Sequence, residues 1–275
     1  MTSDSSQPNG GMVAGFVKNP AVSKLFWTLG GLGIILFLWG IFGYYISENP
    51  ATKSFSTFGL IPTIEAFPIL IEEGKIQSAA IVSSYRLFSG LGIAILIGLP
   101  IGIMVGQLKL FRELSNSPFQ LLRMVSPLAW MPLAVFVFSE WDASIIFLIA
   151  MASVWPIIFS TAAGLAKVDP AWFKVAKNLG ASSTQMVTRI IMPAITFDIL
   201  GGVRLALGVA WIVLVPAEYL GVTSGLGYAI EDARETLSYN HLTAMVVTIG
   251  VIGYALDTFL VILIKKFSWH KGGEF

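Results

Sequence analysis

The chain has 275 residues, of which 55% are hydrophobic and only 12% charged, and its mean hydropathy is +0.78. Soluble domains carry about 25% charged residues, so this composition argues against a soluble enzyme. The net charge of +1 gives no sign of nucleic acid as a partner, and the absence of cysteine excludes disulfides, iron–sulfur clusters and thiolate zinc sites.

Apolar runs along the chain predict an all-α membrane protein with six transmembrane helices, because about 20 apolar residues span a bilayer. The predicted spans cover residues 25–46, 87–106, 120–139, 143–166, 195–216 and 242–264. In the third span Pro127 and Pro132 interrupt the apolar run. The fifth span contains Asp198 and Arg204, and the sixth contains Asp257.

Basic residues gather on one side of the predicted membrane. The tails and connections on that side hold twelve Lys and Arg against four acidic residues, whereas the other side holds four against ten. Connections rich in Lys and Arg stay in the cytoplasm. Both termini, with tails 1–24 and 265–275, and the connection 167–194 are therefore expected to be cytoplasmic.

Small residues recur at every fourth position in two of the spans. The second span carries Gly90, Ala94, Gly98, Gly102 and Gly106, and the fifth carries Gly202, Ala206 and Ala210. Such stripes let helix backbones approach closely in a membrane, so they predict helix packing within the bundle.

The connection between spans four and five predicts a helix, a tight turn and a second helix. Asp169 suits an N-cap, and Gly180 suits the left-handed residue that ends a helix. Ser182 and Gln185 have the spacing of a capping box that starts the second helix, and Pro193 is expected to close it.

Apolar and basic residues of this connection share helix faces. The pattern puts Trp172, Ala176 and Leu179 on one face of the first helix, Met186 and Ile190 on one face of the second, and Lys174, Lys177 and Arg189 between them. The patterning leaves two interpretations open. The helices dock into a partner's groove, or they lie on their own bundle or on lipid headgroups.

The same connection resembles the loop motif of ABC importer permeases, E-A-A-three residues-G-nine residues-I-x-L-P. The matching residues are Ala176, Gly180, Ile190 and Pro193, with Met192 in the Leu position. Lys174 stands where the motif has Glu, so no role of that Glu carries over. The residues that the resemblance assigns to coupling with an ATPase are Asp169, Trp172, Lys174, Ala176, Leu179, Gly180, Ala181, Met186, Ile190 and Pro193.

Further stretches resemble the nitrate, sulfonate, taurine and bicarbonate branch of these permeases. They are SPLAWMPL at 126–133, PAEYLG at 216–221 and GLGY at 225–228. Overall likeness favours the nitrate and nitrite permeases of cyanobacteria, with bicarbonate and sulfonate or taurine permeases as alternatives.

The resemblance implies the type I ABC importer permease fold and a place in the bacterial inner membrane. Two copies of this chain would form the pore, among membrane lipid. Two ABC ATPase subunits would bind ATP and Mg; in cyanobacterial nitrate systems they differ, and one carries a regulatory domain. A substrate-binding protein would dock outside. The chain itself, which lacks G-x-x-x-x-G-K-[ST], is expected to have no catalytic residue, cofactor or metal.

Five residues are candidates for the transport pathway: Arg204, Trp130, Met131, Trp211 and Glu218. An ionisable group inside a span suggests function, so Arg204 either attracts an anion or pairs with Asp257. The tryptophans and Met131 either line the pore or pack in the bundle. Glu218 either orients the following loop or contacts the binding protein.

Two other classes of protein compete with this interpretation. A secondary anion transporter could use the intramembrane carboxylates Asp198 and Asp257, but its usual inverted repeats are not visible. An intramembrane enzyme needs histidines that face each other in the bundle, and His241 and His270 lie at or beyond span ends.

Overall fold

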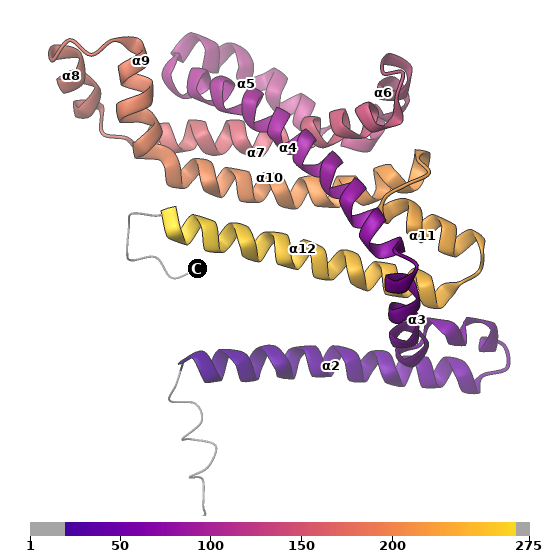
Figure 1. The fold of residues 1–275 in the computed structure, drawn as a ribbon. Coiled ribbons are helices and arrows are strands. Elements are labelled where there is room, and N and C mark those ends of the chain that lie inside the picture. The colour runs from indigo at the N-terminus through magenta and orange to yellow at the C-terminus, as the bar shows by residue number, and fades with distance from the viewer. Residues whose placement is uncertain (1–19, 268–275) are drawn as a thin grey trace, which may run out of the picture. The chain divides into compact units, whose positions relative to one another are not determined.

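The computed structural model describes residues 20–267, so most of the two predicted tails lies outside the described residues. Within this range the chain is helical and contains no strand (Figure 1). The chain divides into two units, residues 1–67 and 68–275. The helices are α2 (Pro20–Glu48), η1 (Lys53–Phe58), α3 (Leu60–Glu72), α4 (Lys75–Gln107), α5 (Lys109–Met124), η2 (Pro127–Trp130), α6 (Met131–Val137), α7 (Trp141–Lys167), α8 (Pro170–Asn178), α9 (Ser183–Gln185), the π-helix η3 (Met186–Ile191), α10 (Met192–Gly221), α11 (Leu226–Glu235) and α12 (Tyr239–Phe267).

The first unit is built on α2, which contains the first predicted span. Its apolar side chains from Phe26 onward are mostly exposed, as suits a helix that faces lipid. The indole Nε1 of Trp39 donates a hydrogen bond of 2.9 Å to the carbonyl of Phe58. Gly43 lies against the backbone of Gly59, where a Cβ would come within 2.9 Å of Gly59 Cα. This contact and the indole bond hold η1 against α2.

Five helices among the described residues are long and apolar enough to cross a membrane. They comprise residues 26–48, 75–107, 141–167, 183–221 and 239–266. α5 and the segment formed by η2 and α6 meet at an angle of 89°. Together they make a sixth candidate span only if this bent pair is counted as one span. The third predicted span, 120–139, is therefore two helices that meet at a sharp bend instead of one helix.

The bend follows from Pro127. The residue before a proline disfavours helical backbone, and Ser126 is accordingly extended, with φ −56° and ψ 130°. Pro132, which also interrupts the apolar run, lies in the first turn of α6, where proline is tolerated. Only the first of the two prolines therefore breaks the helix.

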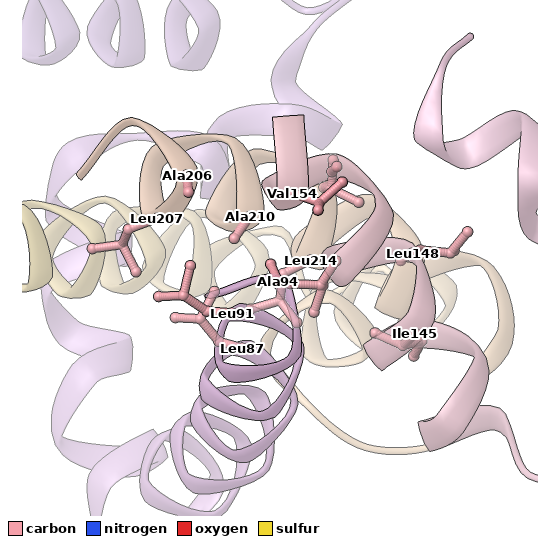
Figure 2. Close-up of a cluster of buried hydrophobic side chains, with 14 of the residues drawn as sticks. Leu87, Leu91, Ala94, Ile145, Leu148, Val154, Ala206, Leu207, Ala210 and Leu214 are labelled. Carbon is pink, nitrogen blue, oxygen red and sulfur yellow. The ribbon is translucent and has the colours of Figure 1, made fainter. Parts of the chain in front are cut away.

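α7 is the central helix of the second unit and packs between α4 and α10 (Figures 1 and 2). The predicted stripe on α4 faces it. A Cβ on Gly98 would lie 2.9 Å from Ile157 Cγ2, and a Cβ on Gly102 would lie 2.7 Å from Thr161 Cβ. On α10, a Cβ on Gly202 would lie 2.6 Å from Ser160 Cβ. Both stripes thus pack helices, as the sequence predicts.

α4 begins at Lys75, twelve residues before the apolar run that predicts the second span. Arg86 therefore lies inside a helix, whereas the charge pattern assigns it to a connection. At the opposite end of the bundle, the Lys167 ammonium bonds to the Asp198 carboxylate at 2.5 Å, which fastens α7 to α10 where α8 begins.

Candidate functional site

The segment from Lys167 to Ser182 folds as local chemistry dictates. The Asp169 carboxylate accepts a hydrogen bond of 2.8 Å from the Ala171 backbone N–H and caps α8, with Pro170 in the first turn. Ser182 and Gln185 form both bonds of a capping box at the start of α9. These caps satisfy backbone N–H groups that a helix start otherwise leaves unpaired.

Gly180 makes the turn between the two helices. Its φ is +77°, in the left-handed region that glycine adopts without steric penalty. The Ala181 N–H bonds to the Ala176 carbonyl at 3.0 Å and the Gly180 N–H bonds to the Lys177 carbonyl at 3.1 Å. This bonding pattern closes the C-terminus of α8 and reverses the chain.

Pro193 does not close the second helix, as the sequence pattern predicts that it should. α9 runs through the π-helix η3 into α10, so that one continuous helix extends from Ser183 to Gly221. The Met192 N–H bonds to the Val187 carbonyl, five residues back. This wider turn sits directly before the proline, which lacks an N–H, so the helix continues past it.

The apolar face that α8 presents to solvent differs from the predicted one. Ala176 is buried, whereas Trp172, Val175 and Leu179 are exposed, Leu179 by 82%. Of the predicted face, Trp172 and Leu179 are exposed, whereas Ala176 lies at its edge and is buried on the side where Phe173 packs against the bundle. The exposed apolar face is defined here as Trp172, Val175 and Leu179.

The other predicted coupling residues lie around this face. Lys174 and Lys177 are exposed on α8, and Ala181 is half-buried in the turn. Met186 packs against the buried cluster of Leu165, Ile191, Ile195 and Ile199, while Ile190 is half-buried. The inner side of the segment thus rests on its own bundle, as one of the two interpretations predicts, and its outer side is exposed.

Arg204 pairs with Asp257. The guanidinium Nε and Nη2 bond to the two carboxylate oxygens at 2.7 and 2.8 Å, a bidentate bridge between α10 and α12. This geometry supports the pairing alternative for Arg204, because its charge is balanced and two donor atoms are used. Asp198, on the same helix, bonds to Lys167 instead.

Of the predicted pathway candidates, two side chains pack in the bundle and one also lines a cavity. Trp211 packs into the core, where the absent side chain of Gly253 leaves room for its indole. Met131 packs against the core at the start of α6. Trp130 both contacts the core and lines a cavity of about 510 Å³. Of the three, Trp130 alone is among the residues that line this cavity.

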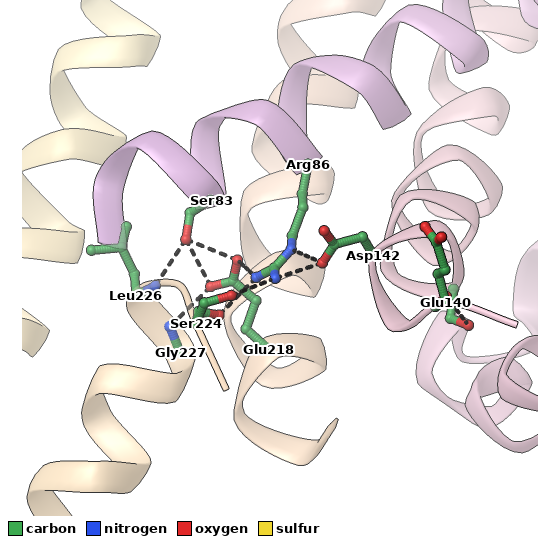
Figure 3. Close-up of polar contacts among 9 residues, drawn as sticks. Ser83, Arg86, Glu140, Asp142, Glu218, Ser224, Leu226 and Gly227 are labelled. Atoms are coloured by element: carbon green, nitrogen blue, oxygen red, sulfur yellow. Dashed lines mark hydrogen bonds and ion pairs between the residues drawn. The ribbon is translucent and has the colours of Figure 1, made fainter. Parts of the chain in front are cut away.

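Glu218 lies at the centre of a buried polar cluster (Figure 3). Its carboxylate is fully buried and accepts bonds from Ser83 Oγ at 2.8 Å, Arg86 Nη1 at 2.7 Å and the Gly227 N–H at 3.0 Å. Ser83 Oγ accepts from the Leu226 N–H at 2.8 Å. Glu218 thus holds the start of α11 against α4. This geometry agrees with the alternative in which Glu218 orients the loop that follows it.

Arg86 completes this cluster and joins two further segments to it. Its Nε and Nη2 bond to Asp142 Oδ1 at 3.0 and 2.6 Å, and its two terminal nitrogens bond to the carbonyl and hydroxyl of Ser224. Gly225, with φ +108°, passes so close to Glu218 that any Cβ would meet the carboxylate. The Arg86 cluster is defined as Ser83, Arg86, Asp142, Glu218 and Ser224.

Sequence reasoning found Glu218 but missed Arg86, Ser83 and Asp142. A lone arginine twelve residues into a helix, followed by the apolar run, is the signal that could have found Arg86. Its partners come from 56 and 132 residues away along the chain, and no local pattern links them.

The sequence and the fold of this chain are similar to those of known proteins. The family described as binding-protein-dependent transport system inner membrane component matches residues 98–269. The chain belongs to this family. A bicarbonate transport system permease protein, CmpB of Synechococcus elongatus, is 32% identical over 243 residues, which cover 83% of this chain and 87% of the relative.

Other relatives of this permease are named for different substrates. SsuC of Bacillus subtilis, a candidate aliphatic sulfonates permease, is 33% identical over 257 residues, or 93% of this chain and 87% of the relative. The nitrate import permease NrtB of Synechocystis is 32% identical over 178 residues, or 65% of each chain. The relatives are permease subunits and not enzymes.

Two solved structures share the permease fold. The MetNI methionine ABC transporter in an inward-facing conformation matches with a TM-score of 0.60 at 16% identity, over 70% of this chain and 95% of that chain. An amino acid ABC transporter matches with 0.56 at 18% identity, over 75% and 96%. The chain is thus a multi-pass inner-membrane permease of an ABC importer, which works with ATPase subunits and a substrate-binding protein.

Proposed function

We propose that this permease forms, with a second copy of itself, the pore of an ATP-driven importer for a small oxyanion, and that nitrate or nitrite is the first substrate to test. Three relatives are named for bicarbonate, sulfonates and nitrate, which all present negatively charged oxygens. Bicarbonate and sulfonate or taurine are the alternatives within the same class.

The segment 167–194 is proposed as the site where the ATPase subunits dock, on the cytoplasmic side. The observation that carries this assignment is the exposed apolar face of Trp172, Val175 and Leu179, next to Lys174 and Lys177. Exposed aromatic and aliphatic side chains on a short, capped helix are typical of an interface that a partner covers. Closure of an ATPase dimer would move this segment, and with it α10.

Gly180→Trp tests the coupling. The substitution forces a residue with a Cβ into the left-handed region, at about 1–2 kcal/mol, and no atom of this chain lies within 4 Å of that Cβ to clash with it. We expect ATP-dependent nitrate uptake to be abolished in proteoliposomes that contain the ATPases and the binding protein, while the permease remains in the membrane. Normal uptake by this variant would refute the assigned role of the segment.

The substrate is best identified through the external binding protein, because a pathway that must release its ion holds that ion weakly. Calorimetric titration of the binding protein encoded beside this permease with nitrate, nitrite, bicarbonate and taurine would rank the candidates. Retention of bicarbonate or taurine with no response to nitrate would replace the first choice by that ligand.

A further inference from the structure

Arg123 is a cation at the end of α5 that faces an aromatic ring instead of a carboxylate. Its guanidinium carbon lies 5.0 Å from the centroid of the Phe159 ring. None of the ion pairs or hydrogen bonds between described residues involves Arg123. By contrast, Arg86, Lys167 and Arg204 on the neighbouring helices each bond to Asp or Glu.

Arg123 is exposed in the single chain, and the ring that it faces lies well inside the length of α7. Phe159 is eight residues, or about 12 Å, from the end of α7 at Lys167 and about 27 Å from its start at Trp141. The hydrocarbon core of a bilayer is about 30 Å thick, and a helix of the length of α7 that crosses it centrally places Phe159 within the core. An unpaired cation at this depth is costly unless water or an anion reaches it.

A cavity reaches this cation. It has a volume of about 510 Å³ and is lined by α5, η2, α7 and α10, with Arg123, Trp130, Trp155, Phe159, Ser160 and Leu205 among its residues. A water molecule takes about 30 Å³, so the cavity can hold an oxyanion with part of its hydration shell. Ser160 and the two tryptophans are side chains of the wall that can donate hydrogen bonds.

We propose that this Arg123 cavity is a binding site for the transported oxyanion on its way through the pore, which deepens the proposed function. A guanidinium that stacks on a ring keeps its N–H donors for a second partner, and its planar fork matches the oxygens of nitrate, bicarbonate or a sulfonate group. The mainly apolar walls offer an anion few polar partners besides Arg123. Arg204, held by Asp257, is not available for the same task.

The site is suited to transit and not to capture. One cation among mainly apolar walls attracts an anion without enclosing it in a full set of donors, so the ion can leave again. The same site accepts oxyanions that differ in shape, because the fork recognises two oxygens and not the rest of the molecule. Discrimination between nitrate, bicarbonate and sulfonates therefore rests with the binding protein.

The transport test uses the full complex in proteoliposomes and compares Arg123→Gln with Arg112→Gln. Arg112 is an exposed arginine eleven residues earlier on α5, on the same helix face and about 16 Å away. With saturating binding protein, we expect Arg123→Gln to lower the number of nitrate ions transported per ATP at least tenfold while stimulated ATP hydrolysis persists. Arg123→Lys should fall between, since it keeps the charge without the fork, and Arg112→Gln should match the wild type. An unchanged ratio in Arg123→Gln would overturn the proposal.

A second arm does not depend on transport or on the identity of the substrate. Trp130 and Trp155 line the cavity, so iodide that gathers near Arg123 should quench part of the tryptophan fluorescence of the purified complex. We expect Arg123→Gln to reduce quenching by iodide severalfold relative to quenching by neutral acrylamide. Equal iodide quenching in both proteins would refute the site even if no anion were transported.

Loss of co-purified anionic phospholipid in the variant, with iodide quenching unchanged, would assign Arg123 to a lipid headgroup instead. Failure of the wild type to transport any of the three anions would count against the proposed function alone.

Discussion

Arg86 shows what a buried charge requires in this protein. The side chain is 1% exposed, and all of its donor nitrogens bond: to Asp142, to Glu218, and to the carbonyl and hydroxyl of Ser224. Glu218 is 0% exposed, whereas Asp142 is half-exposed. A buried charge is stable only when charged and hydrogen-bonding groups around it replace the lost water. Each member of this cluster therefore depends on the others.

Glu218→Ala is expected to destabilise the permease by about 3–5 kcal/mol, because it leaves the Arg86 charge short of a partner and the Gly227 N–H unpaired. The melting temperature of the detergent-solubilised complex would measure this loss. Glu235→Ala, which removes an exposed acidic side chain from α11, serves as the control and should leave the melting temperature unchanged. Equal melting of the two variants would contradict a structural role for the cluster.

Single residues in this chain were predictable where their partners lie within a few positions. Asp169, Gly180 and Ser182 act through backbone groups one to five residues away, and the structure has all three in their predicted roles. The partners of Arg86 are set by how distant segments pack. A charged residue beside an apolar run looks like the edge of a membrane span, so the sequence alone assigned Arg86 to a connection.

At the level of helices, glycines set the distance between α4 and α7. At Gly102 a Cβ would lie 2.7 Å from Thr161 Cβ and 2.9 Å from the Ile158 carbonyl oxygen, whereas at Gly92, on another face of α4, no atom lies within 4 Å. The face of α4 at Gly102 can therefore pack against α7 only because it has no side chain there, whereas the face at Gly92 has room for one.

This contrast provides a matched pair of substitutions. Gly102→Ala should separate α4 from α7 and lower stability by about 1–3 kcal/mol, the cost of overpacking. Gly92→Ala should be neutral or stabilise by about 0.5–1 kcal/mol, because alanine favours a helix interior. Thermal unfolding of the two variants measures the difference. A loss of stability in Gly92→Ala as large as in Gly102→Ala would show that the close contact is not the cause.

The helices themselves were predictable to the extent that apolar runs define them. The runs predicting spans one, two, four, five and six each lie within a long helix, but α4 extends beyond its run and the helix that contains α10 begins before Pro193. A proline in the sequence suggests a break at both Pro127 and Pro193. The π-helix before Pro193 removes that conflict, and no residue pattern identifies such a turn in advance.

For the whole molecule, α10 presents a face that the other helices of the second unit leave exposed. Leu205 and Ile212 are 62% and 72% exposed, and Gly201 and Gly208 have no atom within 4 Å of a Cβ position. Small residues between large apolar ones allow close packing of a further membrane helix. The second copy of the chain that the proposed pore requires would have a suitable surface here.

Because the chain contains no cysteine, a single introduced cysteine reports on this surface. We expect Gly208→Cys to form a disulfide-linked dimer when membranes are oxidised, since a disulfide needs Cα atoms within about 7 Å. Leu96→Cys, on an exposed position of α4, is the control and should remain monomeric. Electrophoresis without reductant distinguishes the results, and cross-linking of Leu96→Cys alone would place the partner on α4 instead.

The unbroken helix from Ser183 to Gly221 is about 58 Å long at 1.5 Å per residue. One end carries the capping box beside Gly180, and the other carries Glu218 in its last turn, bonded to Arg86. The π-helix before Pro193 and Pro216 in α10 are the points at which this helix can bend. If the segment 167–194 docks an ATPase as proposed, the same helix joins that dock to the Arg86 cluster, so a shift at one end bears on the ion pairs at the other.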